Sequence, residues 1–133
     1  MIVREALMAD PRVVQAGAGA REAAELLTHP QVSSVLVADG DVLVGCISAE
    51  SIVAAVARGL DPRSATAREF ADAEVATISP DLPLDEALHR MAELDLERIA
   101  VTEEGRLLGV VAREPIARRL AEDEPPPPLD DSG

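Results

Sequence analysis

The chain has 133 residues and a formal net charge of −13, from 25 acidic residues against 12 bases, every one an arginine. Hydrophobic residues make up 47% of it, which is ample for a packed interior and excludes wholesale disorder. The negative field repels nucleic acid and anionic membrane surfaces, and no apolar run is long enough to cross a bilayer. We therefore expect neither nucleic acid nor membrane as a partner.

The single cysteine, Cys46, cannot form a disulfide within the chain. This usage favours a cytoplasmic location, and the first segment lacks the basic-then-apolar pattern of a secretion signal. Cys46 lies within an apolar strand pattern, so we interpret its thiol as a small buried hydrophobic group.

The first half predicts, in chain order, a strand, a helix, two strands joined by a hairpin turn, and a second helix. The helix stripe has i, i+3, i+4, i+7 spacing, whereas the strands are short β-branched runs. The elements are a strand at 13–14, a helix with its apolar stripe at Ala20, Ala23, Ala24 and Leu27, a strand at 33–37, its return strand at 42–47, and a helix capped by Ser48 that carries Ile52, Val53 and Val56 inward.

The second half repeats this order after the linker GLDPRSATAREF, in which Thr66 and Glu69 have the spacing of a capping box for a short helix. Its predicted elements are a strand at 75–78, a helix with its stripe at Leu84, Ala87, Leu88 and Met91, a hairpin of strands at 98–101 and 107–111, and a last helix carrying Ile116, Ala117 and Leu120. The segment EDEPPPPLDDSG then predicts a disordered, acidic, proline-rich tail over residues 122–133.

The two halves match without a gap at an offset of 64 residues, the separation of Gly45 and Gly109. Other identical pairs include Arg4 and Glu5 with Arg68 and Glu69, Glu22 and Ala23 with Glu86 and Ala87, Val37 with Val101, Leu43 with Leu107, Glu50 with Glu114, and Ile52 with Ile116. We infer a tandem duplication, with repeats at residues 1–63 and 64–121. Neither repeat can cover its own sheet, so we predict an α+β, sandwich-like fold of two βαββα repeats packed sheet against sheet about a pseudo-twofold axis.

The motifs of both repeats resemble the CBS-domain pair, also called a Bateman module. The second repeat carries TISPDLPLDEALHRM, and each repeat passes from a glycine-bearing strand into its last helix, as LVGCISAES and LLGVVAREP. The resemblance covers roughly residues 2–121, and the linker is similar to that of small standalone actinobacterial CBS-pair proteins of the hypoxic response protein type. It implies clefts between two sheets where adenosine-containing nucleotides bind, a homodimer, and a regulatory function without catalysis.

The family motif runs glycine, two apolar residues, Ser or Thr, two variable residues and Asp. The resemblance implies that the hydroxyl meets a phosphate and the carboxylate meets the ribose. In the first repeat Ser48 supplies the hydroxyl, but Ser51 stands in place of the Asp. In the second repeat Ala112 and Pro115 stand at the two polar positions, so the resemblance implies weakened nucleotide sites.

Carried over position by position, the resemblance marks candidate ligand residues in both repeats. They are Val14, Gly45, Ser48, Ser51, Ile78, Arg98, Gly109 and Ala112. Arg98 begins a strand near the implied cleft, where it is either a phosphate contact or a solvated edge-strand charge. The implied ligand is an adenosine nucleotide (AMP, ADP or ATP) or S-adenosylmethionine, and the sequence itself requires no cofactor.

Two functions stay open at this point. One is a standalone CBS-pair module that senses a small molecule for an unidentified protein partner, and the other is a ligand-free structural or interaction dimer. Both imply a homodimer, for which apolar helix faces would be supplied by Ala54, Ala55 and Val56 or by Ala117 and Leu120.

We expect no catalytic residues, because no nucleophile–base grouping or phosphate-binding loop is present in the sequence. We also expect no metal site. His29 precedes a proline in a predicted turn and His89 lies on a helix flank, which does not favour a shared ligand set.

Overall fold

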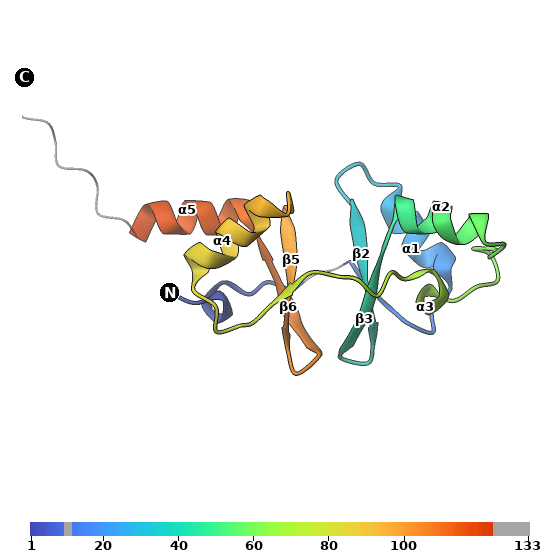
Figure 1. Cartoon of the computed structure of the whole chain (residues 1–133), viewed down its shortest axis with the longest axis horizontal. Coiled ribbons are helices and arrows are strands. Elements are labelled where there is room, and N and C mark those ends of the chain that lie inside the picture. The colour runs from blue at the N-terminus through green and yellow to red at the C-terminus, as the bar shows by residue number, and fades with distance from the viewer. Residues whose placement is uncertain (10–11, 124–133) are drawn as a thin grey trace, which may run out of the picture.

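The computed structural model describes residues 1–9 and 12–123, which form two similar halves, each with a small sheet and with helices on its outer side (Figure 1). In chain order the elements are a 3-10 helix η1 (Val3–Ala6), β1 (Val13–Gln15), α1 (Ala20–Leu27), β2 (Ser34–Asp39), β3 (Val42–Ser48), α2 (Ala49–Ala57), α3 (Ala67–Phe70), β4 (Thr77–Ile78), α4 (Leu84–Glu93), β5 (Arg98–Glu103), β6 (Arg106–Ala112) and α5 (Arg113–Asp123). The N-terminus lies beside the second half (Figure 1).

Every predicted helix and strand is present, so the βαββα order of both repeats is confirmed. One strand is shorter than predicted, because β4 has only two residues instead of the four at 75–78. Val75 turns away from the strand, since its N–H donates to the carbonyl of Ala73 (3.1 Å) and its side chain packs between the sheets.

The face that α2 turns inward differs from the prediction. Ala55 is fully buried and Ile52 partly buried, whereas Val53 and Val56 are 69% and 49% exposed. Ile52 and Ala55 are three residues apart and share a face, and each following residue is rotated by about 100° from it. The prediction that Val53 and Val56 face the core is therefore wrong.

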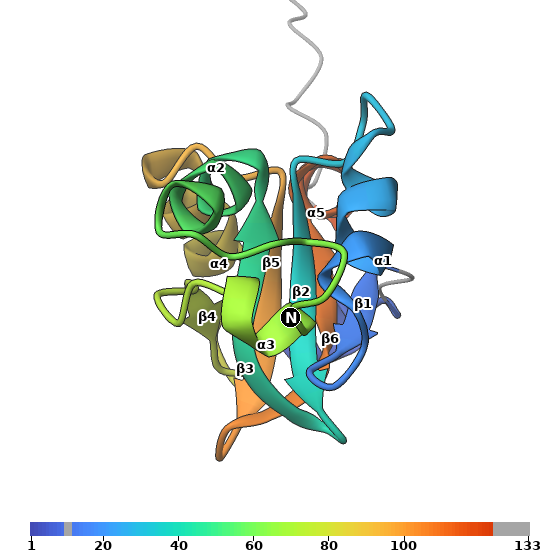
Figure 2. The same ribbon diagram turned by 90° about the vertical axis from the view of Figure 1, so that its right-hand side faces the viewer.

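Each half holds three strands in the same arrangement. β1 runs parallel to β2, which is antiparallel to β3, and in the second half β4, β5 and β6 repeat this pattern. The two sets join at Val42 and Arg106, near the hairpin tips, which makes one strand order β1-β2-β3-β6-β5-β4. Figures 1 and 2 show that the two hairpins face each other and that the helices lie on the outside.

Each half has its own hydrophobic core beneath its helices, and a third cluster lies between the sheets. The third cluster is built on Leu36 from the first half and on Ala100 and Val110 from the second, with partly buried Cys46 and Val75 around them. Sheet-to-sheet packing about a pseudo-twofold axis is therefore confirmed.

The two repeats exchange their opening segments. η1 packs into the core of the second half, where Val3 is fully buried with Leu84 and Ile116. The helix at the same place in the second repeat, α3, packs into the core of the first half through Ala67 and Phe70. The sequence boundary between residues 63 and 64 therefore does not separate the two cores in space.

The hydrogen bonds that hold these segments repeat at the same offset of 64. Val3 N–H donates to Leu82 (2.9 Å), as Ala67 N–H donates to Ala18 (2.7 Å). The ends of the segments pair across strands in the same way, Met8 with Val110 in one half and Asp72 with Cys46 in the other, each by two N–H to carbonyl bonds. Both repeats thus use one docking geometry, in which the other repeat's strand receives the segment.

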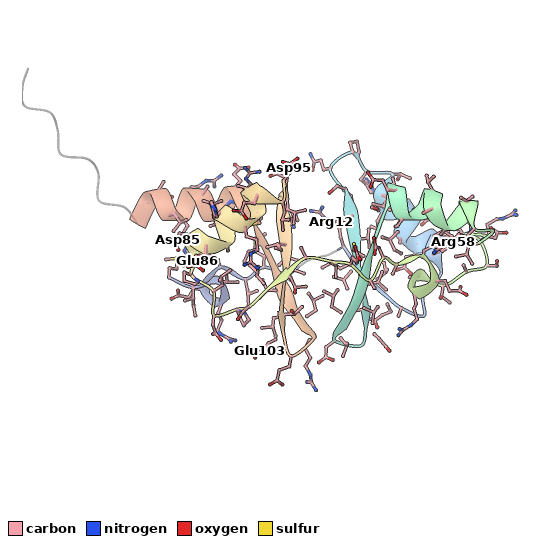
Figure 3. The ribbon with its side chains drawn as sticks, viewed as in Figure 1. Arg12, Arg58, Asp85, Glu86, Asp95 and Glu103 are labelled. Carbon is pink, nitrogen blue, oxygen red and sulfur yellow. The ribbon has the colours of Figure 1, made fainter. Side chains whose placement is uncertain are left out.

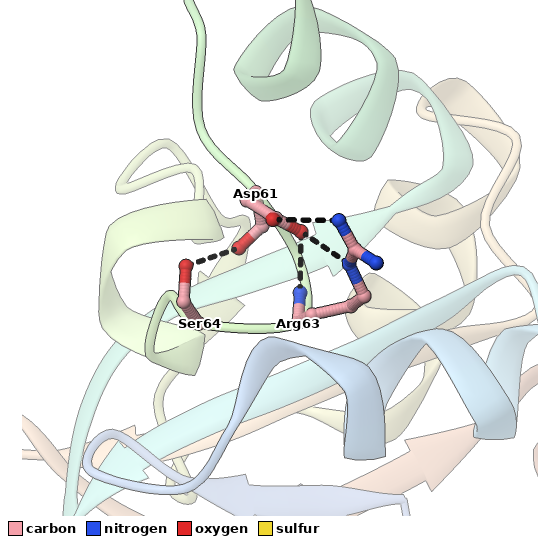
Figure 4. Close-up of polar contacts among 3 residues, drawn as sticks. All are labelled: Asp61, Arg63 and Ser64. Atoms are coloured by element: carbon pink, nitrogen blue, oxygen red, sulfur yellow. Dashed lines mark hydrogen bonds and ion pairs between the residues drawn. The ribbon is translucent and has the colours of Figure 1, made fainter.

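The linker before α3 is fixed by a local polar cluster (Figure 4). The Asp61 carboxylate accepts from the backbone N–H of Arg63 (2.9 Å) and from its guanidinium, which lowers the pKa of Asp61 and raises that of Arg63. The predicted capping residue Glu69 accepts from the N–H of the N-cap residue Thr66 at 2.7 Å, so its side chain satisfies a backbone donor at the start of α3.

The last helix, α5, continues to Asp123, two residues into the predicted tail. Residues 124–133 of that tail lie outside the part of the chain that the structure describes. Among the described helices, none combines the length and apolar character that crossing a membrane requires.

Candidate functional site

A cleft of about 400 Å³ lies between the two sheets, at the ends where β2 and β5 begin. Its apolar part is formed by Leu36, Ala100 and Val110, the three buried residues of the inter-sheet cluster. The volume falls within the range of small-molecule sites in proteins. Figure 3 labels two further lining residues, Arg12 and Asp95, near the gap between the halves.

The polar residues of the cleft come from equivalent positions of the two repeats. Gln31 and Asp95, Ser33 and Glu97, and Ser34 and Arg98 are pairs at the offset of 64, and all six line the cleft. The cleft therefore straddles the pseudo-twofold axis. Within these three pairs the two sides differ in charge, because the first repeat contributes neutral groups and the second contributes two acids and an arginine.

Arg98 is the charged residue of the cleft that is best placed to meet a ligand. Its side chain is half-buried and makes no hydrogen bond or ion pair within the described residues. The neighbouring carboxylates of Asp95 and Glu97 lie 4.0 and 3.9 Å from the guanidinium of Arg113, so they face a different arginine. An unpaired guanidinium at a partly apolar cleft can bind an anionic group through charge-assisted hydrogen bonds.

Of the eight residues predicted from the sequence, Arg98 lines the cleft itself. Ser48 and Ala112 lie directly beside it, because they pair in register with Ser34 and Arg98 on the neighbouring strands. These three form one region at the start of α2 and α5.

The other predicted residues lie elsewhere. Val14 and Ile78 are buried in the separate cores of the two halves, under the helices. Gly45 and Gly109 are buried beneath the exchanged segments, next to Asp72 and Met8. Neither pair is among the cleft-lining residues.

The remaining predicted residue, Ser51, is engaged with Ser48. The Ser51 N–H donates to the Ser48 hydroxyl (3.2 Å), and the Ser48 N–H donates to the Ser51 hydroxyl (2.8 Å), which in turn donates to the Ser48 carbonyl (2.9 Å). The two side chains thus form a reciprocal cap at the start of α2. Ser51, which stands where the family has a carboxylate, has a structural partner for its hydroxyl.

The start of α5 is held differently. The N–H of Arg113 donates to the carbonyl of Glu97 at 2.8 Å, and the two motif positions carry Ala112 and Pro115. Proline is tolerated in the first turn of a helix, where its missing N–H has no intrahelical partner to lose. A backbone contact therefore fastens the second helix where hydroxyls cap the first.

The sequence prediction missed six polar or charged cleft residues: Arg12, Gln31, Ser33, Ser34, Asp95 and Glu97. Four of them precede the central strands β2 and β5, at positions outside the family motif. The repeat offset was the available signal, since it pairs 31 with 95 and 33 with 97 across an axis between the two sheets.

The described residues contain no group of three or more His, Cys, Asp or Glu side chains placed to hold a metal ion. His89 contacts Glu93 on its own helix, with Nε2 2.8 Å from the carboxylate oxygen. Cys46 faces the inter-sheet cluster, and burial, with a smaller contribution from the charge of Asp72, raises the pKa of its thiol.

Comparisons with known proteins agree with this architecture. The model of the CBS domain family matches twice, at residues 3–58 and 67–122. Hypoxic response protein 1 of Mycobacterium tuberculosis is 38% identical over 85 residues, which are 63% of this chain and 59% of that protein. The aligned part thus spans less than two thirds of the curated relative.

Solved structures match over nearly the whole chain. A structure of Hypoxic Response Protein I with two coordinated zinc ions has a TM-score of 0.71 at 28% identity, covering 90% of this chain and 98% of the other. CBSX2 in complex with AMP has a TM-score of 0.70 at 20% identity, covering 91% and 96%. The CBS pair of MJ0100 with 5′-methylthioadenosine and S-adenosylmethionine has 0.64 at 24% identity, covering 93% and 98%.

The last two likenesses concern the fold alone, because their identities are low. The structure of Hypoxic Response Protein I contains zinc, whereas the residues described for this chain include no group of three or more side chains placed to hold a metal ion. Two matches of one family model, covering most of the sequence and coinciding with the two structural repeats, leave one assignment: the chain belongs to the CBS domain family and contains a CBS-domain pair.

Proposed function

We propose that this CBS pair is a regulatory, non-catalytic module that binds an adenosine-containing small molecule in the cleft between its sheets and works as a homodimer. The observation that carries the proposal is the unpaired Arg98 beside the apolar surface of Leu36, Ala100 and Val110. An apolar surface suits a flat purine, and a guanidinium suits a phosphate or carboxylate. Solved CBS pairs that carry AMP or S-adenosylmethionine support this class of ligand.

We expect the affinity to be lower than a complete motif would provide. Ser51 replaces a carboxylate, and Ala112 and Pro115 leave the second repeat without either polar group. Each lost charge-assisted hydrogen bond costs about 1.5–3 kcal/mol, which is about one to two decades in affinity. Arg98 would then supply a large part of the remaining polar recognition.

Isothermal titration of the protein with AMP, ADP, ATP and S-adenosylmethionine tests the proposal. We expect binding of at least one ligand, and a loss of about tenfold or more in Arg98→Ala. The matched control is Arg90→Ala, which removes an exposed arginine of α4 that also has no partner in the described residues. Binding that survives Arg98→Ala unchanged would place the ligand outside this cleft.

A ligand-free structural or interaction dimer is the second candidate function. It is favoured by the reciprocal bonds of Ser48 and Ser51, which occupy the first-repeat hydroxyls. Mass spectrometry of small molecules released from the freshly purified protein separates the two, since it requires no guess about the ligand. An empty protein that also shows no titration heat would support the second candidate.

Other parts of the functional assignment stay predictions. The single cysteine favours a cytoplasmic location, and the acidic composition disfavours nucleic acid. A protein partner that reads the state of the cleft is expected for a regulatory module.

A further inference from the structure

The opening segment of the chain, residues 1–9, is linked to the cleft through one residue of β6. Met8 and Val110 exchange two backbone hydrogen bonds, each 2.9 Å long, in which the N–H of one residue donates to the carbonyl of the other. Val110 is only 1% exposed, and it belongs to the apolar part of the cleft. One residue of the cleft wall therefore has its backbone fixed by the opening segment.

The chain is bonded to the other side of the cleft four residues later. The carbonyl of Arg12 accepts the N–H of Leu36 at 2.9 Å, and both residues line the cleft. Met8 and Arg12 are thus fastened to different halves of the molecule. Their partners, Val110 and Leu36, are two of the three buried residues of the inter-sheet cluster. Both apolar walls of the cleft consequently depend on where Met8 and Arg12 are held.

The equivalent segment of the second repeat makes the same bonds without reaching the cleft. Asp72 exchanges two backbone hydrogen bonds with Cys46, of 2.9 and 2.7 Å. Neither Cys46 nor Ala76, which stands at the offset of 64 from Arg12, is among the described residues that line the cleft. The two docked segments are alike in the fold, but they differ in their relation to the cleft.

The opening segment also forms part of an exposed surface on the second half (Figure 1). Beyond the buried Val3, the guanidinium of Arg4 lies 2.9 Å from the carboxylate of Glu103, and the two side chains are 48% and 49% exposed. Arg119 of α5 donates to the carbonyl of Glu5 at 2.9 Å. A change in the docking of residues 1–9 would therefore alter a surface built from η1, β5 and α5.

We propose that ligand binding in the cleft is coupled to the docking of the opening segment, so that a bound ligand holds residues 1–9 on the second half. Val110 is the coupling residue. If Met8 leaves, the N–H and the carbonyl of Val110 lose their partners at a nearly inaccessible position, and the strand must shift to satisfy them. A ligand packed on Val110 binds the docked form more tightly and shifts the population toward it.

This inference rests on the proposed function and names the way in which an occupied cleft is communicated. The occupied cleft fixes the surface that carries Arg4, Glu103 and Arg119, whereas the empty cleft permits it to open. Because coupling between two sites is reciprocal, a protein that binds this surface in its docked form raises the affinity of the cleft by the same factor. A partner can thus sense the ligand without touching it.

Hydrogen exchange of single amides, followed by NMR on the full chain, measures the coupling. The probes are AMP, ATP and S-adenosylmethionine, each at about 100 times the dissociation constant found by calorimetry. The reporters in the opening segment and the matched reporters at the offset of 64 are all hydrogen-bonded backbone N–H groups: those of Val3, Arg4 and Met8, and those of Ala67, Arg68 and Asp72.

We expect a bound probe to slow exchange in the opening segment by about 10- to 100-fold. The upper value is the limit for a ligand that binds the docked form alone at this concentration. Exchange of the matched reporters should change by less than about threefold, because the strand that receives them contributes no residue to the described cleft lining.

A pair of proline substitutions tests the coupling from the other side. Met8→Pro removes the N–H that donates to β6, and Asp72→Pro removes the equivalent donor to β3. The preceding residues, Leu7 and Ala71, have ψ angles of 139° and 141°, a conformation that a following proline permits. We expect affinity for the probe to fall at least about fivefold in Met8→Pro and to stay within about twofold of the wild type in Asp72→Pro.

Urea denaturation of the two variants supplies the structural reference. Each substitution removes one equivalent backbone bond, so both should be destabilised, and a merely structural role of Met8 predicts no difference in binding between them. Should Met8→Pro fail to fold, the exchange measurement on the unmodified chain decides alone.

Three results overturn the coupling: equal slowing of both reporter sets, unchanged exchange of both sets with a probe bound, and equal affinities of the two folded proline variants. The first would show that the ligand stabilises the whole fold without a preferred segment. In all three cases a probe binds, so the proposed function stands. If no probe binds, the proposed function fails, and the coupling fails with it.

Discussion

A Cβ atom on Gly45 would lie 2.5 Å from the backbone carbonyl oxygen of Asp72. The equivalent atom on Gly109 would lie 2.6 Å from the carbonyl oxygen of Met8. In both places the exchanged segment crosses the third strand of the other repeat and pairs with the next residue. The glycine of the family motif therefore serves here to let two backbones approach.

Replacing either glycine by alanine should destabilise the protein, because the obstructing atoms belong to the backbone and cannot rotate away. We expect Gly45→Ala and Gly109→Ala each to lower the free energy of unfolding by about 1–3 kcal/mol in urea denaturation. Gly17→Ala is the control, since a Cβ there meets nothing within 4 Å. Equal stability of Gly45→Ala and Gly17→Ala would show that the crossing segment shifts freely.

Substitution of Val3 tests the exchange of opening segments. Val3 belongs to the first repeat in sequence, yet its side chain is buried in the core of the second half with Leu84 and Ile116. We expect Val3→Ala to cost about 1–3 kcal/mol and to lower the midpoint of one cooperative transition. Leu94→Ala, at a side chain that is 50% exposed, should cost less than about 0.5 kcal/mol.

Removing the Ser51 hydroxyl should lower the free energy of unfolding and leave the affinity for the ligand unchanged. Ser51→Ala loses the bonds to the Ser48 N–H and carbonyl at the start of α2. We expect a loss of about 0.5–2 kcal/mol in the free energy of unfolding. Titration of the same variant with the ligand identified for the wild type should give an unchanged dissociation constant. A large loss of affinity would instead assign the hydroxyl to the ligand.

The thiol of Cys46 should give the protein a decline in stability at high pH. Its pKa lies above the ordinary value of 9.0, because burial and then the charge of Asp72 oppose the thiolate. The folded state keeps the proton where the unfolded thiol loses it, so the contribution to stability is full below pH 9.0 and falls as pH rises through that value.

Urea denaturation across this pH range measures the effect, with Cys46→Ala as the reference. We expect the wild type to lose free energy of unfolding relative to Cys46→Ala as the pH rises above 9.0, the pKa of the thiol in the unfolded chain. Alkylation of Cys46 should also be slow in the folded protein and fast in urea. Equal rates in both states would contradict a protected thiol.

Periodicity and the repeat offset were sufficient to predict the order of elements and the packing of sheet on sheet. They worked because each helix buries one stripe, and because matching positions such as Val37 and Val101 occupy matching strands. The inward face of α2 was predicted wrongly because nearly every residue between Ile52 and Ala57 is apolar. Such a run has no polar side to mark the solvent, so only the tertiary contacts of Ala55 select the buried face.

The candidate site was predictable only where the family motif reaches it. Arg98 was found from its place at the start of a strand, and Ser48 from its position before a helix. Arg12 and Asp95 lie in loops far apart in sequence, and no local pattern brings them to one cleft. Their approach depends on the relative placement of two sheets, which periodicity along one chain does not contain.

The pairing of Met8 with Val110 also determines the order in which the two cores can be completed during translation. The first repeat can finish its core soon after Phe70 leaves the ribosome, because α3 follows the other helices and strands of that core in the chain. The segment that carries Met8 must instead wait for β6, which is synthesised much later, since Met8 and Val110 pair by two backbone bonds. The nascent chain therefore keeps η1 and Met8 undocked until β6 has emerged, and this earlier segment docks last.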